Sequence, residues 1–183
     1  LFLDSINYGI RSYLACLLAF LILRSDIYLI NLFRGLEETG LYSLPVSFCD
    51  AILLIVSSTG LVLFPKITEN QGIGLETTLK VSRVVTFITS IVIISGLIFG
   101  GWFIPFIFGE NFRASVPVFY ILLFAVYFWS VNSLLSQFFA SKGYPWAMVW
   151  IWLPGVILNI LLNIIFIPLH GIIAAAISSL VAY

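Results

Sequence analysis

Long runs of apolar residues, each about the length of a membrane-spanning helix, dominate this 183-residue sequence. A helix that crosses the hydrocarbon core of a bilayer needs about 20 predominantly apolar residues. Polar and proline breaks delimit such runs at 13–33, 41–64, 84–108, 116–140 and 146–167, and a sixth begins at Gly171. The last run is about 20 Å long as a helix, short of the ~30 Å core. The pattern therefore predicts an all-α transmembrane bundle of about six helices with the last one truncated.

The composition excludes several classes of protein. Hydrophobic residues make up 62% of the chain and charged residues only 9%, with eight basic and eight acidic side chains. Soluble domains carry about 25% charged residues, and nucleic-acid binders need a basic excess. We therefore expect no soluble domain and no nucleic-acid partner. The chain begins at Leu1 and its single methionine is Met148, so we expect residues 1–183 to be part of a longer protein.

Several single residues carry smaller predictions. Cys16 and Cys49 both lie in apolar runs, where a cysteine serves as a small packing residue rather than as part of a disulfide framework. Pro45 and Pro154 lie inside predicted helices and predict kinks. Tryptophans near segment ends are typical interface anchors, although they can equally be space-filling residues; they are Trp102, Trp146 and Trp150.

The distribution of lysine and arginine predicts the orientation in the membrane. With the N-terminus in the cytoplasm, five basic residues fall inside (Arg11, Lys66, Lys80, Arg83, Lys142) and two fall outside (Arg34, Arg113). Positive residues favour the cytoplasmic side, so this orientation is preferred. The long connector 65–83 is then cytoplasmic. Its Leu75 and Leu79 are spaced for a short interfacial helix, but an ordinary solvated connector fits equally well.

Three ionisable residues lie within the first two predicted helices. Such residues cost about 2.5–3.5 kcal/mol each at bilayer depth, so they need a reason to be there. Arg24 and Asp26 point about 200° apart on a helix and cannot pair with each other. Asp50 on the second helix matches the depth of Arg24 and could pair with it. The alternatives are a neutralised pair that fixes helix register and a charged cavity wall, and we favour the latter.

Two later predicted helices have uncharged polar faces. Asn132 and Gln137 lie with serines on one helix, whereas Gly155, Asn159 and Asn163 follow one another at intervals of four on the next. Interhelical hydrogen bonds and close packing are the default explanation, and a cavity lining is the alternative. The sequence shows no metal-ligand spacing and no phosphate-binding glycine loop, so we expect no metal site and no enzymatic activity.

The order of several short motifs resembles the second half of bacterial oligosaccharide flippases. The motifs are Arg24-Ser25-Asp26, Gly40-Leu41-Tyr42, Phe64-Pro65-Lys66, Phe108-Gly109-Glu110-Asn111-Phe112, Ala140-Ser141-Lys142-Gly143, Asn159 with Asn163, Ile167-Pro168 and Gly171 with Ala174-Ala175. These flippases belong to the multidrug/oligosaccharidyl-lipid/polysaccharide exporter superfamily. The resemblance implies two lobes of six helices around a cavity that opens alternately to each side, with residues 1–183 forming the C-terminal lobe.

The resemblance also implies a function in polysaccharide or lipopolysaccharide biosynthesis at the bacterial inner membrane. The substrate would be a lipid-linked oligosaccharide, and the partners would be membrane lipid and the N-terminal lobe. Candidate cavity residues are Arg24, Asp26, Asp50, Asn132, Gln137, Asn159 and Asn163. No cofactor is expected beyond a coupling ion, H⁺ or Na⁺. The alternatives are a multidrug exporter of the same superfamily, a membrane-embedded glycan polymerase or ligase, and a membrane scaffold without transport activity.

Overall fold

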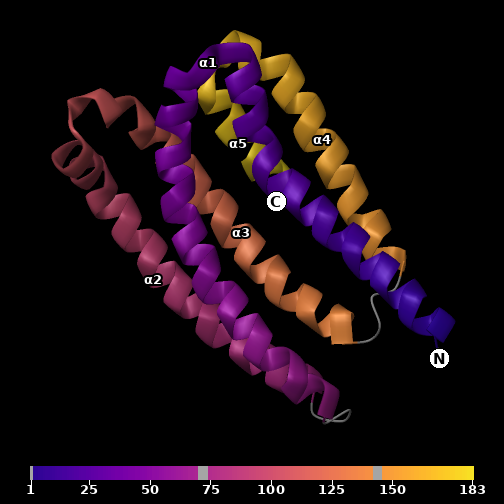
Figure 1. The fold of residues 1–183 in the computed structure, drawn as a ribbon. Coiled ribbons are helices and arrows are strands. Elements are labelled where there is room, and N and C mark those ends of the chain that lie inside the picture. Colours follow the sequence, from indigo (N-terminus) through magenta and orange to yellow (C-terminus); the bar gives the residue numbers. More distant parts are fainter. Residues whose placement is uncertain (1, 70–73, 142–145) are drawn as a thin grey trace.

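The chain folds into a bundle of long helices (Figure 1). The computed structural model describes the backbone of residues 2–69, 74–141 and 146–183, and the side chains of 5–59, 79–133, 136, 146, 149–150 and 152–183. The elements are α1 (Phe2–Glu69), α2 (Gly74–Phe108), the 3₁₀ helix η1 (Glu110–Ala114), α3 (Ser115–Ser141), α4 (Trp146–His170) and α5 (Ile172–Ala182). These ranges contain no strand, which confirms the predicted all-α bundle.

The first helix is folded back on itself at Gly35. This glycine has φ 83° and ψ −174°, the non-helical backbone angles recorded inside α1. A side chain would clash in that conformation, whereas glycine adopts it freely. The fold produces two antiparallel arms, called here the first arm (residues 2–34) and the second arm (residues 36–69), as Figure 1 shows at the top of the bundle. Two arms and four further helices account for the six predicted segments.

The break in α1 falls at Gly35 and not at Pro45, where the sequence predicted a kink. Pro45 lies inside the second arm, and α4 likewise continues through Pro154 and Pro168 to His170. Residues 34–40, which the sequence predicted as a connector between the first two segments, are helical except at Gly35. A single residue with a positive φ reverses the chain, because the rest of the connector contains good helix formers such as Leu36 and Glu37.

The region between the second arm and α2 also differs from the sequence prediction. α1 continues past Pro65 to Glu69, and α2 begins at Gly74. The short interfacial helix or solvated connector predicted around Leu79 is instead the first part of α2. No glycine or proline interrupts residues 75–95, so nothing ends the helix there.

The core lies where the two arms meet α3, α4 and α5. Its largest fully buried side chains include Tyr42 and Ile30 on α1, Leu123 on α3 and Ile167 on α4. The outward faces of α2 and α4 carry large exposed apolar side chains, among them Ile98 and Phe106 on α2, and Trp150 and Leu169 on α4. α2, α3, α4 and the folded α1 are long and apolar enough to cross a membrane. Exposed apolar faces of this kind are typical of helices that contact lipid.

Charged residues gather at the two ends of the bundle. The Gly35 turn, η1 and the Gly171 turn lie at one end, called here the Gly35 end (Figure 1). Among the described side chains this end carries Arg34 and Arg113, whereas Arg11 and Arg83 lie toward the opposite, N-terminal end. The grouping of basic residues agrees with the predicted alternation of the helices. Lys142 lies outside the described residues.

Candidate functional site

An ion pair joins the two arms of α1 at mid-depth in the bundle. Arg24 lies about 15 Å along the helix from Arg34, which is half of the ~30 Å hydrocarbon core. Its Nη2 donates to Oδ2 of Asp50 at 2.9 Å. The side chains of Arg24 and Asp50 are 34% and 40% exposed, respectively. The predicted pairing of these residues is therefore confirmed, and the pair is partly exposed instead of fully buried.

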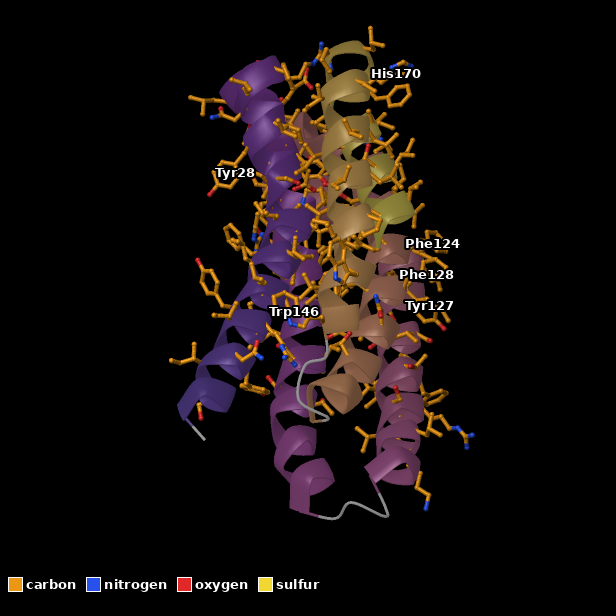
Figure 2. The ribbon with its side chains drawn as sticks, turned by 90° about the vertical axis from the view of Figure 1, so that its right-hand side faces the viewer. Tyr28, Phe124, Tyr127, Phe128, Trp146 and His170 are labelled. Carbon is orange, nitrogen blue, oxygen red and sulfur yellow. The ribbon has the colours of Figure 1, made fainter. Side chains whose placement is uncertain are left out.

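Polar side chains extend from this ion pair along both arms. On the first arm Tyr28 is 65% exposed and Asn31 is also exposed, and Figure 2 shows Tyr28 pointing away from the bundle. On the second arm Ser43 and Ser47 precede Asp50 at the spacing of one helix face. Both serine hydroxyls donate to carbonyls of their own helix, to Thr39 and Ser43 respectively. Arg24, Tyr28, Asn31, Ser43, Ser47 and Asp50 are called here the polar face.

Asp26 points to the opposite side of the first arm and is 1% exposed. Its carboxylate accepts hydrogen bonds from the hydroxyl of Tyr42 on the second arm and, at 3.1 Å, from Oγ of Ser179 on α5. The backbone N–H of Ile27 donates to the other carboxylate oxygen at 2.9 Å. This one carboxylate therefore connects three helical segments: the first arm, the second arm and α5.

A second buried polar group joins the first arm to α4. Ser25 Oγ donates to Asn159 Oδ1 at 2.8 Å, and Asn163 Nδ2 donates to the same oxygen at 3.1 Å. Asn159 Nδ2 and Asn163 Oδ1 are buried without a partner among the described residues. Both asparagines are 0% exposed. They belong to the interior and not to the polar face, so the default explanation of an interhelical hydrogen bond holds for Asn159.

A cavity of about 20 Å³ lies between the two acidic residues. Asp26, Cys49, Asp50 and Tyr183 are among its lining residues. A volume of about 10–15 Å³ is enough for one water molecule. The interior of the bundle therefore has room for one water-sized species beside Asp26, and Asp50 of the polar face also lines this cavity.

The remaining sequence predictions concern residues away from this region. Asn132 is exposed on α3 and its carbonyl accepts a hydrogen bond from Ser136; no described hydrogen bond joins its side chain to the polar face. The side chain of Gln137 lies outside the described residues. Cys49 is buried, as predicted for a packing residue, whereas Cys16 is exposed, so the packing prediction is wrong for Cys16. No group of three His, Cys, Asp or Glu that could hold a metal occurs in the part of the chain that is described.

Packing predictions are also confirmed near α4. A Cβ on Gly155 would lie 3.4 Å from the carbonyl oxygen of Ala182 and from Ile22, so this glycine permits close approach of α5 and the first arm. Trp146 lies at the N-terminal end of α4 (Figure 2). The guanidinium of Arg11 is 5.6 Å from the centroid of its ring. A cationic and an aromatic side chain together are typical of the membrane–water interface.

Sequence reasoning missed the partners of the predicted residues. Tyr42 and Ser179 bind Asp26, and Ser25 binds Asn159, yet each is a common residue in an apolar run. Ser43 and Ser47 offered a signal, because together with Asp50 they follow the i, i+4, i+7 spacing of one helix face.

The comparisons with known proteins point to a membrane protein without defining its activity. No family model matches the chain, and no solved structure matches it. The chain is 28% identical over 157 residues to a protein described as Uncharacterized membrane protein MJ1068 from Methanocaldococcus jannaschii. The match covers 82% of the chain but only 31% of that protein, so the chain spans about a third of its relative's length. Together with the apolar helices, this similarity supports a multi-pass membrane protein.

Proposed function

We propose that residues 1–183 form one lobe, the C-terminal one, of a transporter that flips lipid-linked oligosaccharides across the cell membrane by alternating access. The observation that carries the proposal is the partly exposed Arg24–Asp50 ion pair at mid-depth, continued by the polar face. The motif order that resembles oligosaccharide flippases supplies the class of substrate. The proposal describes a transporter and not an enzyme.

The energetic cost of the polar face is the first argument. A charged side chain at the bilayer centre costs about 2.5–3.5 kcal/mol even on insertion scales that allow relaxation. Lipid tails could not satisfy the exposed hydroxyl of Tyr28 or the amide of Asn31. The polar face therefore requires water or another polar protein surface, and a central cavity shared with a second lobe provides both.

The chemistry of Arg24 is the second argument. A guanidinium binds phosphate and carboxylate groups through two parallel hydrogen bonds. Asp50 occupies one such position, and the exposed remainder of the guanidinium is accessible to an incoming anion. In the proposed cycle, the diphosphate or an acidic sugar of the substrate replaces Asp50, and Asp50 takes its place again after release. The polyprenyl tail stays in lipid.

Asp26 is proposed to hold the coupling ion, H⁺ or Na⁺. It is the buried carboxylate of the described membrane-embedded segments, and the cavity of about 20 Å³ beside it has room for one small species. Its partners come from the second arm and α5. Ion binding there would change how these elements hold together, which is the coupling that alternating access needs.

The alternative functions predict other features. A multidrug exporter that attracts cations would favour unpaired acidic residues on the polar face, whereas Asp50 is neutralised by Arg24. A glycan polymerase or ligase would carry a large extracytoplasmic loop, whereas the described connections at the Gly35 end are single glycines and the short η1. These observations favour the flippase.

The test is complementation of a strain that lacks the full-length protein, with surface glycan display as the readout. Arg24→Lys keeps the charge but not the two-pronged geometry, so we expect partial display; with Arg24→Ala we expect almost none. Arg113→Ala is the matched control, because Arg113 is exposed at the Gly35 end and pairs only locally with Glu110. Normal display with Arg24→Ala at equal membrane levels of protein would overturn the proposal.

A further inference from the structure

A hollow of about 520 Å³ lies between α2 and α3 toward the N-terminal end of the bundle. Its polar lining residues are Ser82, Arg83, Thr86 and Ser90, all on one stretch of α2. Its apolar lining residues are Leu79 and Phe87 of α2 and Val131 of α3. A basic side chain beside apolar ones is an arrangement that suits an amphipathic ligand.

The position of Arg83 along α2 places it at the membrane surface. It lies about 38 Å along the helix from Phe108, which is more than the ~30 Å hydrocarbon core but less than the ~40–45 Å of the whole bilayer. Arg83 is therefore level with the lipid headgroups, while Phe87 and Val131 reach into the region of the acyl chains.

Arg83 differs from the other described arginines in lacking a partner. Arg24, Arg34 and Arg113 each pair with a carboxylate, and Arg11 binds Asn7 and lies over Trp146. Arg83 is exposed and forms no ion pair or hydrogen bond with any described residue. An unpaired guanidinium beside two hydroxyls offers donors for a phosphate.

We infer that this hollow binds an anionic phospholipid. Arg83, with the hydroxyls of Ser82 and Thr86, holds the headgroup phosphate, and one acyl chain lies against Phe87 and Val131. The charge complementarity selects an anionic lipid over a zwitterionic one, since the phosphate of a zwitterionic lipid is already neutralised by its own headgroup. The site is separate from the polar face, which lies on the two arms of α1.

Native mass spectrometry of the full-length protein in detergent tests the inference, with phosphatidylglycerol and phosphatidylcholine as the added lipids. We expect the wild-type protein to retain phosphatidylglycerol in preference to phosphatidylcholine. Loss of one basic residue at a membrane surface weakens anionic-lipid binding about fivefold, so Arg83→Ala should lower phosphatidylglycerol occupancy by about that factor. Arg113→Ala, which removes an exposed arginine at the other end, should leave the occupancy unchanged.

A second variant separates a lipid site from surface charge alone. Val131→Trp fills the α3 side of the hollow and leaves Arg83 in place, so we expect it to lower phosphatidylglycerol occupancy as well. Unchanged occupancy in Arg83→Ala or in Val131→Trp would overturn the inference, as would equal retention of the two lipids. Displacement of phosphatidylglycerol by millimolar inorganic phosphate would show that the acyl chain contributes nothing and would also overturn it. Preferential binding of polyprenyl phosphate at Arg83 would assign the site to a transported lipid instead.

Discussion

Arg24 Nη2 lies 2.9 Å from Asp50 Oδ2, and this contact joins two arms of one helix that are reversed at Gly35. More than a third of the Asp50 side chain and about a third of the Arg24 side chain are exposed. A fully buried pair would resist exchange of partners, because each charge freed from it would be stranded in the interior. A half-exposed pair contributes about 0–1 kcal/mol to stability. The pair is therefore suited to opening and closing around an anion.

Exchanging the charges of Arg24 and Asp50 tests whether the ion pair itself stabilises the protein, whichever of the two positions carries the arginine. Arg24→Asp places two carboxylates together, so we expect the apparent melting temperature in detergent to fall. Asp50→Arg should have a similar effect by placing two guanidinium groups together. The double variant restores an ion pair across the arms and should recover most of the lost stability. If the double variant is no more stable than either single variant, the two residues do not interact in the folded protein.

The fold was largely predictable, because each helix that crosses a membrane needs about 20 predominantly apolar residues. Six apolar runs of helical length gave six helical segments, and their alternation placed Arg11 and Arg83 at one end and Arg34 at the other. The reversal at Gly35 was not predictable to the residue. A glycine inside a helical pattern is usually tolerated, and only packing of the first arm against α4 shows which residue must reverse the chain.

Of the candidate site, the ion pair was predictable and the buried network was not. Arg24 and Asp50 could be matched from the sequence, because each lies the same number of residues from the turn that joins the first two predicted helices. Asp26 obtains its donors from Tyr42 and Ser179, and the latter is 153 residues away in the chain. No periodicity within one helix reports such a contact, because it depends on how α5 packs between the arms and α4.

Removing the phenol hydroxyl of Tyr42 should destabilise the protein. The hydroxyl donates to the buried carboxylate of Asp26, and a buried acceptor that loses a donor costs about 1–3 kcal/mol. We expect Tyr42→Phe to lower the apparent melting temperature in detergent. Tyr28→Phe makes the same chemical change on an exposed side chain and should have no effect. Equal melting temperatures for the two variants would show that the Tyr42 hydrogen bond contributes nothing.

Gly171 holds the α4–α5 turn against the charged Gly35 end. It has φ 62°, and a Cβ there would lie 2.7 Å from Glu38 Oε2 and 3.3 Å from Arg34 Nη2. Gly109 also has a positive φ, 92°, but a Cβ there would meet nothing within 4 Å. Both alanine variants incur backbone strain of about 1–3 kcal/mol, and only Gly171→Ala also disturbs the Arg34–Glu38 pair. We therefore expect the larger fall in melting temperature for Gly171→Ala, whereas similar falls would mean that the turn moves freely away from the pair.

The N-terminal end of the bundle is predicted to face the cytoplasm, because the basic residues of the connectors are concentrated there. The prediction can be tested by cysteine labelling in intact cells, in a background in which Cys16 and Cys49 are replaced by alanine. Leu79 and Glu110 are both exposed and lie toward opposite ends. A membrane-impermeant maleimide should label Glu110→Cys in intact cells and Leu79→Cys only after permeabilisation.

The opposite labelling pattern would reverse the orientation of the bundle. The prediction rests on connector charge, because the helices themselves are apolar over most of their length. Removing charge should therefore weaken the preference. Replacing Lys66, Lys80 and Arg83 by glutamine leaves the predicted connectors with two basic residues on each side, Arg11 and Lys142 against Arg34 and Arg113. We expect Leu79→Cys in that background to be labelled in a fraction of the intact molecules, and complete protection would show that another part of the protein sets the orientation.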